Sequence, residues 1–217
     1  MADSAFMRAR RPEHKQQRRE AILAAARELA LRSGVRNVSL GGVAAAVGLA
    51  KSNVGRYFGT REEIYLELAA EEWRRWDAAA AERLSTAEGA DDVVAALVDT
   101  VAELPLLCDL LGHTSTSLEH NVSLPAARAF KQTVSGVVTR IGERVAKAHP
   151  ELTASEGTDL VSVVVMLAGS LYPLVNPPET MKRLYAENPE IAALCPPFVP
   201  TMRRAATVFA AGLPRVR

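Results

Sequence analysis

Apolar residues recur along most of the chain at the three-to-four-residue spacing of helices that pack on one side. The clearest case lies in residues 39–58, where four apolar positions fall at i, i+3, i+4 and i+7, namely Leu40, Val43, Ala44 and Val47. Ser39 precedes them and can cap a helix with its hydroxyl, and Gly48 has the backbone freedom that ends one. The stretch therefore predicts a helix, a tight turn and a second short helix that runs to Phe58.

The second short helix has two different sides. Val54 and Phe58 are four residues apart and face back onto the first helix. Its start and outer side then carry only polar or basic residues, which are Lys51, Ser52, Asn53, Arg56 and Tyr57. A short helix with such a face suits the major groove of DNA. The pattern alone also fits two ordinary helices joined by a glycine turn.

The rest of the chain repeats the helical pattern. A capping box, Thr60 with Glu63, begins a helix that runs to about residue 84, and a second, Thr153 with Glu156, leads into an apolar stretch over 159–174. Further helices are expected at 12–33, 91–104, 105–119, 125–148 and 201–213. Prolines are expected to break the chain at 173, 177 and 178 and to bracket an irregular stretch over 189–200.

Neither strand alternation nor a hairpin turn signal accompanies the β-branched runs, so the fold class is all-α. A three-helix N-terminal unit with an arm, residues 1–60, precedes a larger helical domain over 61–217. Residues 1–11 are expected to be disordered.

Charge is distributed unevenly between these two parts. Residues 1–60 hold eleven Lys or Arg against four Asp or Glu, whereas the remainder holds fifteen against twenty-one. A basic head on an acidic body favours binding to nucleic acid, because phosphate contacts supply most non-specific affinity for DNA. Within the arm, Arg8, Arg10 and Arg11 either lie along phosphates or a minor groove, or belong to a solvated tail.

Composition and motifs give no sign of a catalyst. Hydrophobic residues make up 48% of the chain, which indicates a globular protein. No apolar run was expected to reach the length of a membrane span, and no secretion signal is apparent. Cys108 and Cys195 are expected to be buried free thiols in a reducing cytoplasm. The four histidines lack metal-site spacing, and no phosphate-binding glycine loop or nucleophile motif occurs, so we expect neither enzyme activity nor a cofactor.

The stretch V-A-A-A-V-G-L-A-K-S-N-V-G-R-Y-F-G-T-R-E-E-I, residues 43–64, resembles the helix-turn-helix signature of the tetracycline-repressor family of transcriptional regulators. Three positions depart from that signature: Ala50 stands where Ser or Thr usually caps the second helix, Ser52 where Gly or Pro is common, and Gly55 where an aromatic residue is usual. The resemblance implies a sequence-specific DNA-binding regulator. Its expected DNA contacts are Ser39, Lys51, Ser52, Asn53, Arg56, Tyr57 and Arg61.

The same resemblance implies a C-terminal domain that binds a small effector and forms a homodimer on palindromic double-stranded DNA. Residues 159–174 and 201–213 are expected to form a four-helix interface with a second copy. A mostly apolar ligand is expected, and the candidate lining residues are Leu104, Leu107, Leu110, Phe130, Met166 and Tyr172. The alternative function is a helical ligand-binding or interaction protein that does not bind DNA.

Overall fold

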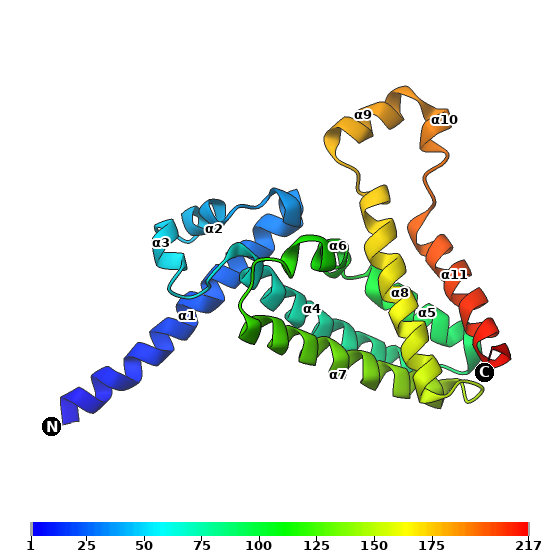
Figure 1. The fold of residues 1–217 in the computed structure, drawn as a ribbon, viewed down its shortest axis with the longest axis horizontal. Helices are drawn as coiled ribbons and strands as arrows, with labels where there is room; N and C mark the ends of the chain where they lie inside the picture. The colour runs from blue at the N-terminus through cyan, green and yellow to red at the C-terminus, as the bar shows by residue number, and fades with distance from the viewer. Residues whose placement is uncertain (1, 217) are drawn as a thin grey trace.

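The regular structure of the protein consists of helices (Figure 1). The structure is a computed structural model, and it describes residues 2–216 and the side chains of 13–114 and 116–216. No strand occurs among the described residues, so the all-α prediction is confirmed. The α-helices are α1 (Ala2–Ser33), α2 (Leu40–Ala46), α3 (Lys51–Val54), α4 (Arg61–Leu84), α5 (Gly89–Ala102), α6 (Pro105–His113), α7 (Leu124–Ala148), α8 (Ala154–Val175), α9 (Glu179–Glu187), α10 (Pro189–Ala192) and α11 (Phe198–Gly212). Three short elements complete the chain: the 3₁₀ helices η1 (Val35–Asn37) and η3 (Leu213–Arg215) and the π-helix η2 (Thr114–Leu118).

The N-terminal head consists of the second half of α1 with η1, α2 and α3. Ile22, Val43 and Val54 are fully buried where these elements meet. The helix that the sequence predicted from Pro12 instead starts at Ala2, so the expectation of a disordered arm is wrong for residues 2–11. This segment contains alanines and arginines, which are good helix formers. Met1 and the side chains of residues 2–12, including Arg8, Arg10 and Arg11, lie outside the described part.

The body packs α4 beside α7, with α8 and α11 adjacent at one end (Figure 1). Its apolar faces form one continuous core with that of the head. Trp73 and Trp76 contact each other edge to face at a centroid distance of 5.6 Å, and both are buried. The pair therefore serves the packing of the core.

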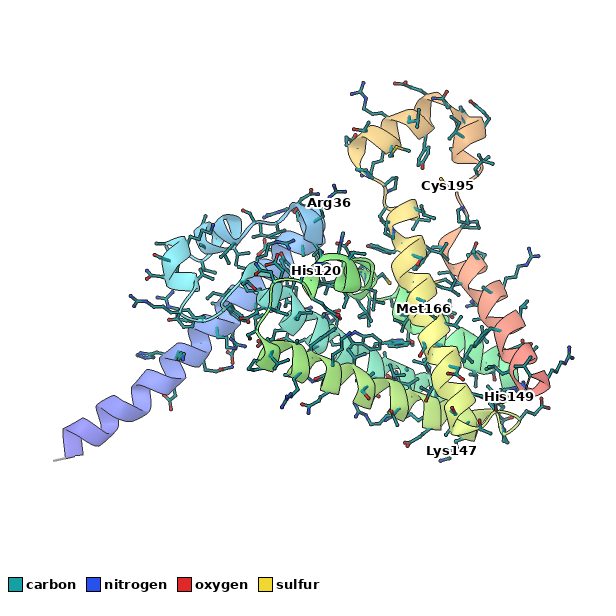
Figure 2. The ribbon with its side chains drawn as sticks, viewed as in Figure 1. Arg36, His120, Lys147, His149, Met166 and Cys195 are labelled. Atoms are coloured by element: carbon teal, nitrogen blue, oxygen red, sulfur yellow. The ribbon has the colours of Figure 1, made fainter. Side chains whose placement is uncertain are left out.

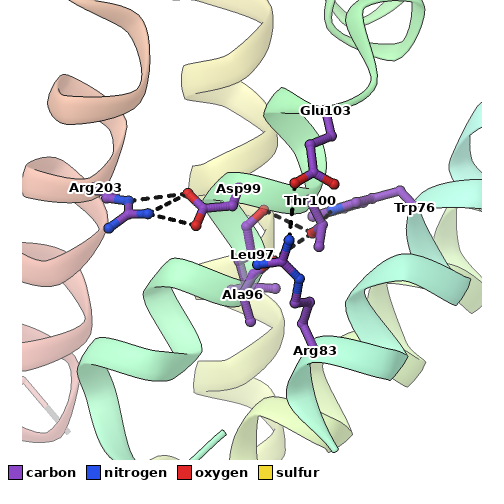
Figure 3. Close-up of polar contacts among 8 residues, drawn as sticks. All are labelled: Trp76, Arg83, Ala96, Leu97, Asp99, Thr100, Glu103 and Arg203. Atoms are coloured by element: carbon purple, nitrogen blue, oxygen red, sulfur yellow. Dashed lines mark hydrogen bonds and ion pairs between the residues drawn. The ribbon is translucent and has the colours of Figure 1, made fainter. Parts of the chain in front are cut away.

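Polar contacts hold α5 between α4 and α11 (Figure 3). The Trp76 indole N–H donates to the buried Thr100 hydroxyl at 3.0 Å, which in turn donates to the Ala96 carbonyl at 2.6 Å. On the other side of α5, Arg203 forms an ion pair with Asp99 at 2.6 Å. Buried polar groups that are all hydrogen-bonded fix the register of α5 against its neighbours.

Helix α8 begins at the predicted capping box, with both reciprocal bonds of Thr153 and Glu156 present. It is the one described helix long and apolar enough to cross a membrane, with only 22% of its apolar window buried. The expectation that no apolar run reaches such a length is therefore wrong. The helix also continues past Pro173 to Val175, whereas the sequence predicted a break there.

Between α8 and α11, the helices α9 and α10 form an arm away from the body (Figure 1). The sequence predicted only an irregular stretch near its second half. No residue of either helix is buried, and Leu194, at the turn after α10, is 81% exposed. The last helix starts at Phe198, three residues earlier than predicted, because a proline is tolerated in a first helical turn.

The two cysteines differ in environment. Cys108 is fully buried, donates to the Val101 carbonyl at 3.2 Å, and has its pKa raised by burial to about 12. Cys195 is only partly buried, so the sequence expectation holds for the first thiol and not for the second.

Candidate nucleic-acid interface and its links to the body

The predicted helix-turn-helix forms with the predicted caps. The Ser39 hydroxyl accepts the Gly42 N–H at 3.0 Å at the start of α2. Gly48 adopts a φ of +65° at the turn, a conformation that favours glycine, and the Leu49 N–H then bonds to the Ala44 carbonyl at 2.9 Å. Val54 and Phe58 are buried behind α3, as the sequence predicted. Lys51, Ser52 and Arg56 are exposed, whereas Asn53 and Tyr57 are partly exposed.

Helix α3 is shorter than predicted, because regular α-helix ends at Val54 and gives way to turns before Phe58. Ala50 offers no side-chain cap at one end, and Gly55 lies at the C-cap of the other. Both positions are among those that depart from the family signature. A missing side-chain cap weakens a short helix by roughly 1 kcal/mol. The outer residues are therefore held mainly by the burial of Val54 and Phe58.

Arg19 of α1 contacts the end of the recognition segment, residues 51–58, from the core side. Its guanidinium donates to the Tyr57 carbonyl at 3.0 Å, forms an ion pair with Glu67 of α4, and lies 4.2 Å from the centre of the Phe58 ring. Arg19 thus joins α1, the chain after α3, and α4.

Arg61 likewise makes internal contacts. It donates to the backbone carbonyls of Val35 and Val38, at 2.5 Å for Val38, and its guanidinium lies 4.7 Å from the centre of the Tyr65 ring. The family resemblance assigned Arg61 to a DNA phosphate. Its donors are directed at the segment before α2 and hold that segment in place, and a phosphate contact by Arg61 stays a prediction.

Thr60 and Glu63 connect the head to the loop before α7. The Thr60 hydroxyl accepts the Glu63 N–H at 3.1 Å and donates to the Asn121 carbonyl at 2.7 Å. The Glu63 carboxylate accepts the N–H groups of Gly59 at 2.8 Å and Ser123 at 3.0 Å. The predicted capping box is thus half formed, because Glu63 bonds to Gly59 and Ser123 rather than to the backbone of Thr60.

This connection predicts a pH-dependent stability. Hydrogen bonding from Ser123, and then from Gly59, holds the pKa of Glu63 below its usual value. A lowered carboxyl pKa contributes stability above the unfolded value of about 4.3, and that contribution is lost as the pH falls through the lower folded pKa. Glu63→Gln should lower the free energy of unfolding by about 1 kcal/mol at neutral pH. Urea unfolding from pH 7 to pH 3 should show the two proteins converging at the acid end; a constant difference would contradict the assignment.

A second link joins the head to α6. The Asp109 carboxylate accepts the Val35 N–H at 2.7 Å, and its other oxygen lies 3.5 Å from the His113 Nε2. Gly34, which precedes Val35, has a φ of +82° that allows the chain to leave α1 sharply. The nearby Tyr65 hydroxyl is buried with no hydrogen-bond partner among the described residues, and burial raises its pKa to about 12. Helix α6 is therefore in direct polar contact with the chain that leads into α2.

Two cavities border the head. One, of about 340 Å³, lies between α1, the end of the recognition segment, α4 and α7. The other, of about 790 Å³, lies between the end of α1, η1, α6 and the chain from α8 into α9. Among the described residues, no group of three His, Cys, Asp or Glu side chains could hold a metal ion.

The six predicted ligand residues do not share one cavity. Phe130 borders the smaller cavity and Tyr172 the larger one. Leu107 and Leu110 are fully buried in the core, and Leu104 is partly buried at the start of α6. Met166 is 61% exposed on the outer side of α8 (Figure 2). The spacing of apolar residues identified the apolar faces of the helices. It could not show which of these residues lie in the core, which line a cavity and which lie on the outer surface.

Comparisons with known proteins agree with this geometry. Residues 22–68 match the family model described as "Bacterial regulatory proteins, tetR family", and residues 70–217 match "Tetracyclin repressor-like, C-terminal domain". No curated protein matches the chain.

Three solved structures have a similar fold. The fatty acid degradation regulator FadR from Bacillus halodurans has a TM-score of 0.55 at 14% identity, covering 89% of this chain and 97% of the other. Thermus thermophilus FadR, a transcriptional repressor in complex with lauroyl-CoA, has a TM-score of 0.51 at 17% identity, covering 71% and 82%. A transcriptional regulator from Rhodococcus sp. RHA1 has a TM-score of 0.56 at 21% identity, covering 75% and 96%.

Proposed function

Because the chain belongs to the tetracycline-repressor family of transcriptional regulators, we propose that it is a cytoplasmic, dimeric repressor that a small, mostly apolar molecule releases from a palindromic operator. The observation that carries the DNA-binding part is the exposed polar edge of the recognition segment on a fixed helix-turn-helix. Lys51, Ser52 and Arg56 are exposed there, and Asn53 is accessible beside them. Base edges or adjacent phosphates are the expected partners of these four residues.

The proposed dimer rests on uncovered apolar side chains of α8 and α11, which pack against each other. Met166 and Leu174 of α8 are 61% and 45% exposed, and Val208 of α11 is 68% exposed. Exposed apolar side chains on two helices that pack together favour a protein partner. A second copy placed around a two-fold axis would cover both helices and would present two recognition segments to two half-sites.

The proposed release by a ligand follows from the links between head and body. Asp109 and the Thr60–Glu63 pair connect the head to helices or loops of the C-terminal domain. A ligand acts as an inducer only if it binds the DNA-incompetent arrangement more tightly than the competent one. The lauroyl-CoA bound by Thermus thermophilus FadR makes a molecule with an acyl chain the first class to test.

The proposal is tested by isolating duplexes that the purified protein binds from a randomised pool and titrating a selected duplex by fluorescence anisotropy. A palindromic consensus and two chains per duplex would support it. Absence of any sequence-selective binding would favour the alternative, a helical ligand-binding or interaction protein.

Asn53 provides the sharpest test of base recognition in that assay. If Asn53 reads a base, Asn53→Ala should weaken binding to the selected duplex by roughly 1–3 kcal/mol and relax sequence preference at one position of each half-site. Gln132→Ala removes an exposed amide from α7, outside the helix-turn-helix, and should leave the affinity unchanged. An Asn53→Ala protein with unaltered affinity and unaltered preference would remove this residue from the interface.

A further inference from the structure

The larger cavity, of about 790 Å³, is shared between the DNA-binding head and the body. Its walls come from the last turn of α1, η1, α6 and the chain from Tyr172 to Lys182. This volume falls in the range of about 300–1,000 Å³ that small-molecule sites occupy. The cavity is therefore large enough for a small organic ligand, and it touches both parts of the protein.

Apolar side chains form part of the cavity lining. Leu31 lies in its wall and is 57% exposed, whereas Ile22, Leu23 and Ala26 of the same helix are buried in the core. Leu106 and the partly buried Tyr172 line the same space, together with prolines of α6, α8 and the chain into α9. A hydrocarbon or aromatic group placed there would remove the exposed surface of Leu31 from water.

Three cations also belong to the lining. Arg32 and Arg36 (Figure 2) come from the head, and Lys182 comes from α9. Arg36 forms no ion pair among the described residues, while Arg32 and Lys182 have only exposed pairs within their own helices, at 3.7 Å to Glu28 and 3.9 Å to Glu179. Exposed ion pairs of this kind contribute little to stability, so Arg32 and Lys182 stay available to a ligand.

Two carboxylates also line the cavity and offset part of this charge. Asp109 is engaged with the Val35 N–H at 2.7 Å, and Glu179 lies on an exposed helix start with its side chain 80% exposed. Three cations thus face two acids, of which one is already hydrogen-bonded. The balance favours a ligand with one negative group.

We propose that this cavity is the effector site and that it binds an amphipathic organic anion, with its acidic head group beside Arg36 and Lys182 and its apolar body against Leu31 and Tyr172. The regulatory role of the site rests on the proposed function, whereas the binding of an anion rests only on the residues that line the cavity. Head and body both contribute to the site, so an occupant changes how they sit against each other. The Asp109–Val35 bond lies in the same wall and transmits that change to the chain before α2.

The binding test compares probes that share one apolar chain. Laurate, 1-dodecanol and lauroyl-CoA are titrated separately into the full-length protein by isothermal calorimetry. Laurate should bind at least about tenfold more tightly than dodecanol, which lacks the charge, and added salt should reduce that ratio. Tighter binding of lauroyl-CoA than of laurate would identify the phosphates of an acyl-CoA, rather than a free carboxylate, as the preferred negative group. Equal affinities for laurate and dodecanol would overturn the proposal.

Neighbouring cations of α9 provide matched variants. Lys182 lines the cavity, whereas the adjacent and equally exposed Arg183 does not. Lys182→Glu should weaken binding of the charged probes at least about tenfold, and Arg183→Glu should leave it within about twofold. Equal effects of the two variants, or no binding of any charged probe, would overturn the site assignment.

DNA binding is measured on the same proteins, so that the repressor proposal and the anion-site proposal can be refuted independently. The ligand-free Lys182→Glu protein should bind the selected duplex like the unmodified protein, and laurate should release it only at higher concentration. Laurate binding without any DNA binding would refute the repressor and retain the anion site. DNA binding that no charged probe alters, while those probes still bind at Lys182, would refute the role of the cavity as the effector site.

Discussion

Replacing Gly157 with alanine is expected to lower the free energy of unfolding by about 3 kcal/mol. Helices α7 and α8 approach so closely here that a Cβ atom on Gly157 would lie 2.3 Å from the Gly142 carbonyl oxygen. The reciprocal position is equally tight, since a Cβ on Gly142 would lie 2.7 Å from the Thr158 nitrogen. Backbone atoms cannot rotate away as a side chain can, so the two helices would have to separate.

Gly212→Ala is the matched control for this change, since a Cβ there would meet nothing within 4 Å. The same methyl group should be neutral or slightly stabilising at the end of α11, because alanine favours helix over glycine by up to about 1 kcal/mol. Urea unfolding followed by circular dichroism gives both values. Equal unfolding free energies for Gly157→Ala and Gly212→Ala would show that the α7–α8 contact does not have the closeness described.

Removing Arg27 should cost about 3 kcal/mol of unfolding free energy. Its guanidinium forms ion pairs with Glu72 and, at 2.7 Å, with Glu71, and thereby joins α1 to α4. Glu72 is 1% exposed and would keep only Arg75 as a partner, at 3.0 Å. Burial acts to lower the pKa of Arg27, but hydrogen bonds and charges from Glu72 and Glu71 outweigh it and raise that pKa. Arg27→Met keeps most of the side-chain volume while leaving a buried carboxylate undercompensated.

A double-mutant cycle separates the ion pair from simple packing. Adding Glu72→Met to Arg27→Met should recover most of the loss, because no buried charge then remains. Arg83→Met breaks a comparable pair with Glu103 whose side chains are 50% and 61% exposed, and it should cost less than about 1 kcal/mol. A double variant as unstable as the sum of the single variants would mean that Arg27 acts through contacts other than Glu72.

Local signals were predictable because they depend on a few adjacent residues. Ser39, Thr60 and Thr153 all accept N–H groups at the starts of the helices that the sequence assigned to them. Gly48 takes the positive φ at the predicted turn. In each case the capping geometry is satisfied within four residues and does not depend on the distant chain.

Contacts across the chain were not predictable in this way. Glu63 has the spacing of a capping-box residue, yet one carboxylate oxygen bonds to Ser123, sixty positions away. Arg19 and Arg61 look like free cations in sequence, and only the fold brings carbonyl groups to them. The larger cavity draws its walls from three separate segments of the chain, so no single periodic stretch could indicate it.

Helix α8 shows how tertiary packing can override a local rule. Pro173 cannot donate an N–H to the Gly169 carbonyl four residues earlier, which is why the sequence predicted a break. In the fold, that carbonyl lies against Gly112 of α6, where a Cβ would come within 2.9 Å. The close approach of α6 covers the altered turn, and the helix continues to Val175.

The π-helical turn η2 has a consequence for how proteins of this kind diverge. Its wide winding, closed by the Glu119 N–H on the Thr114 carbonyl at 3.1 Å, accommodates one residue more than an α-helix would. Losing that residue would rewind the segment and rotate the following chain by about 100°. Asn121 and Ser123 would then no longer face Thr60 and Glu63. A single codon gained or lost at this turn would therefore change the contacts between the body and the head while leaving the sequence of the helix-turn-helix unchanged.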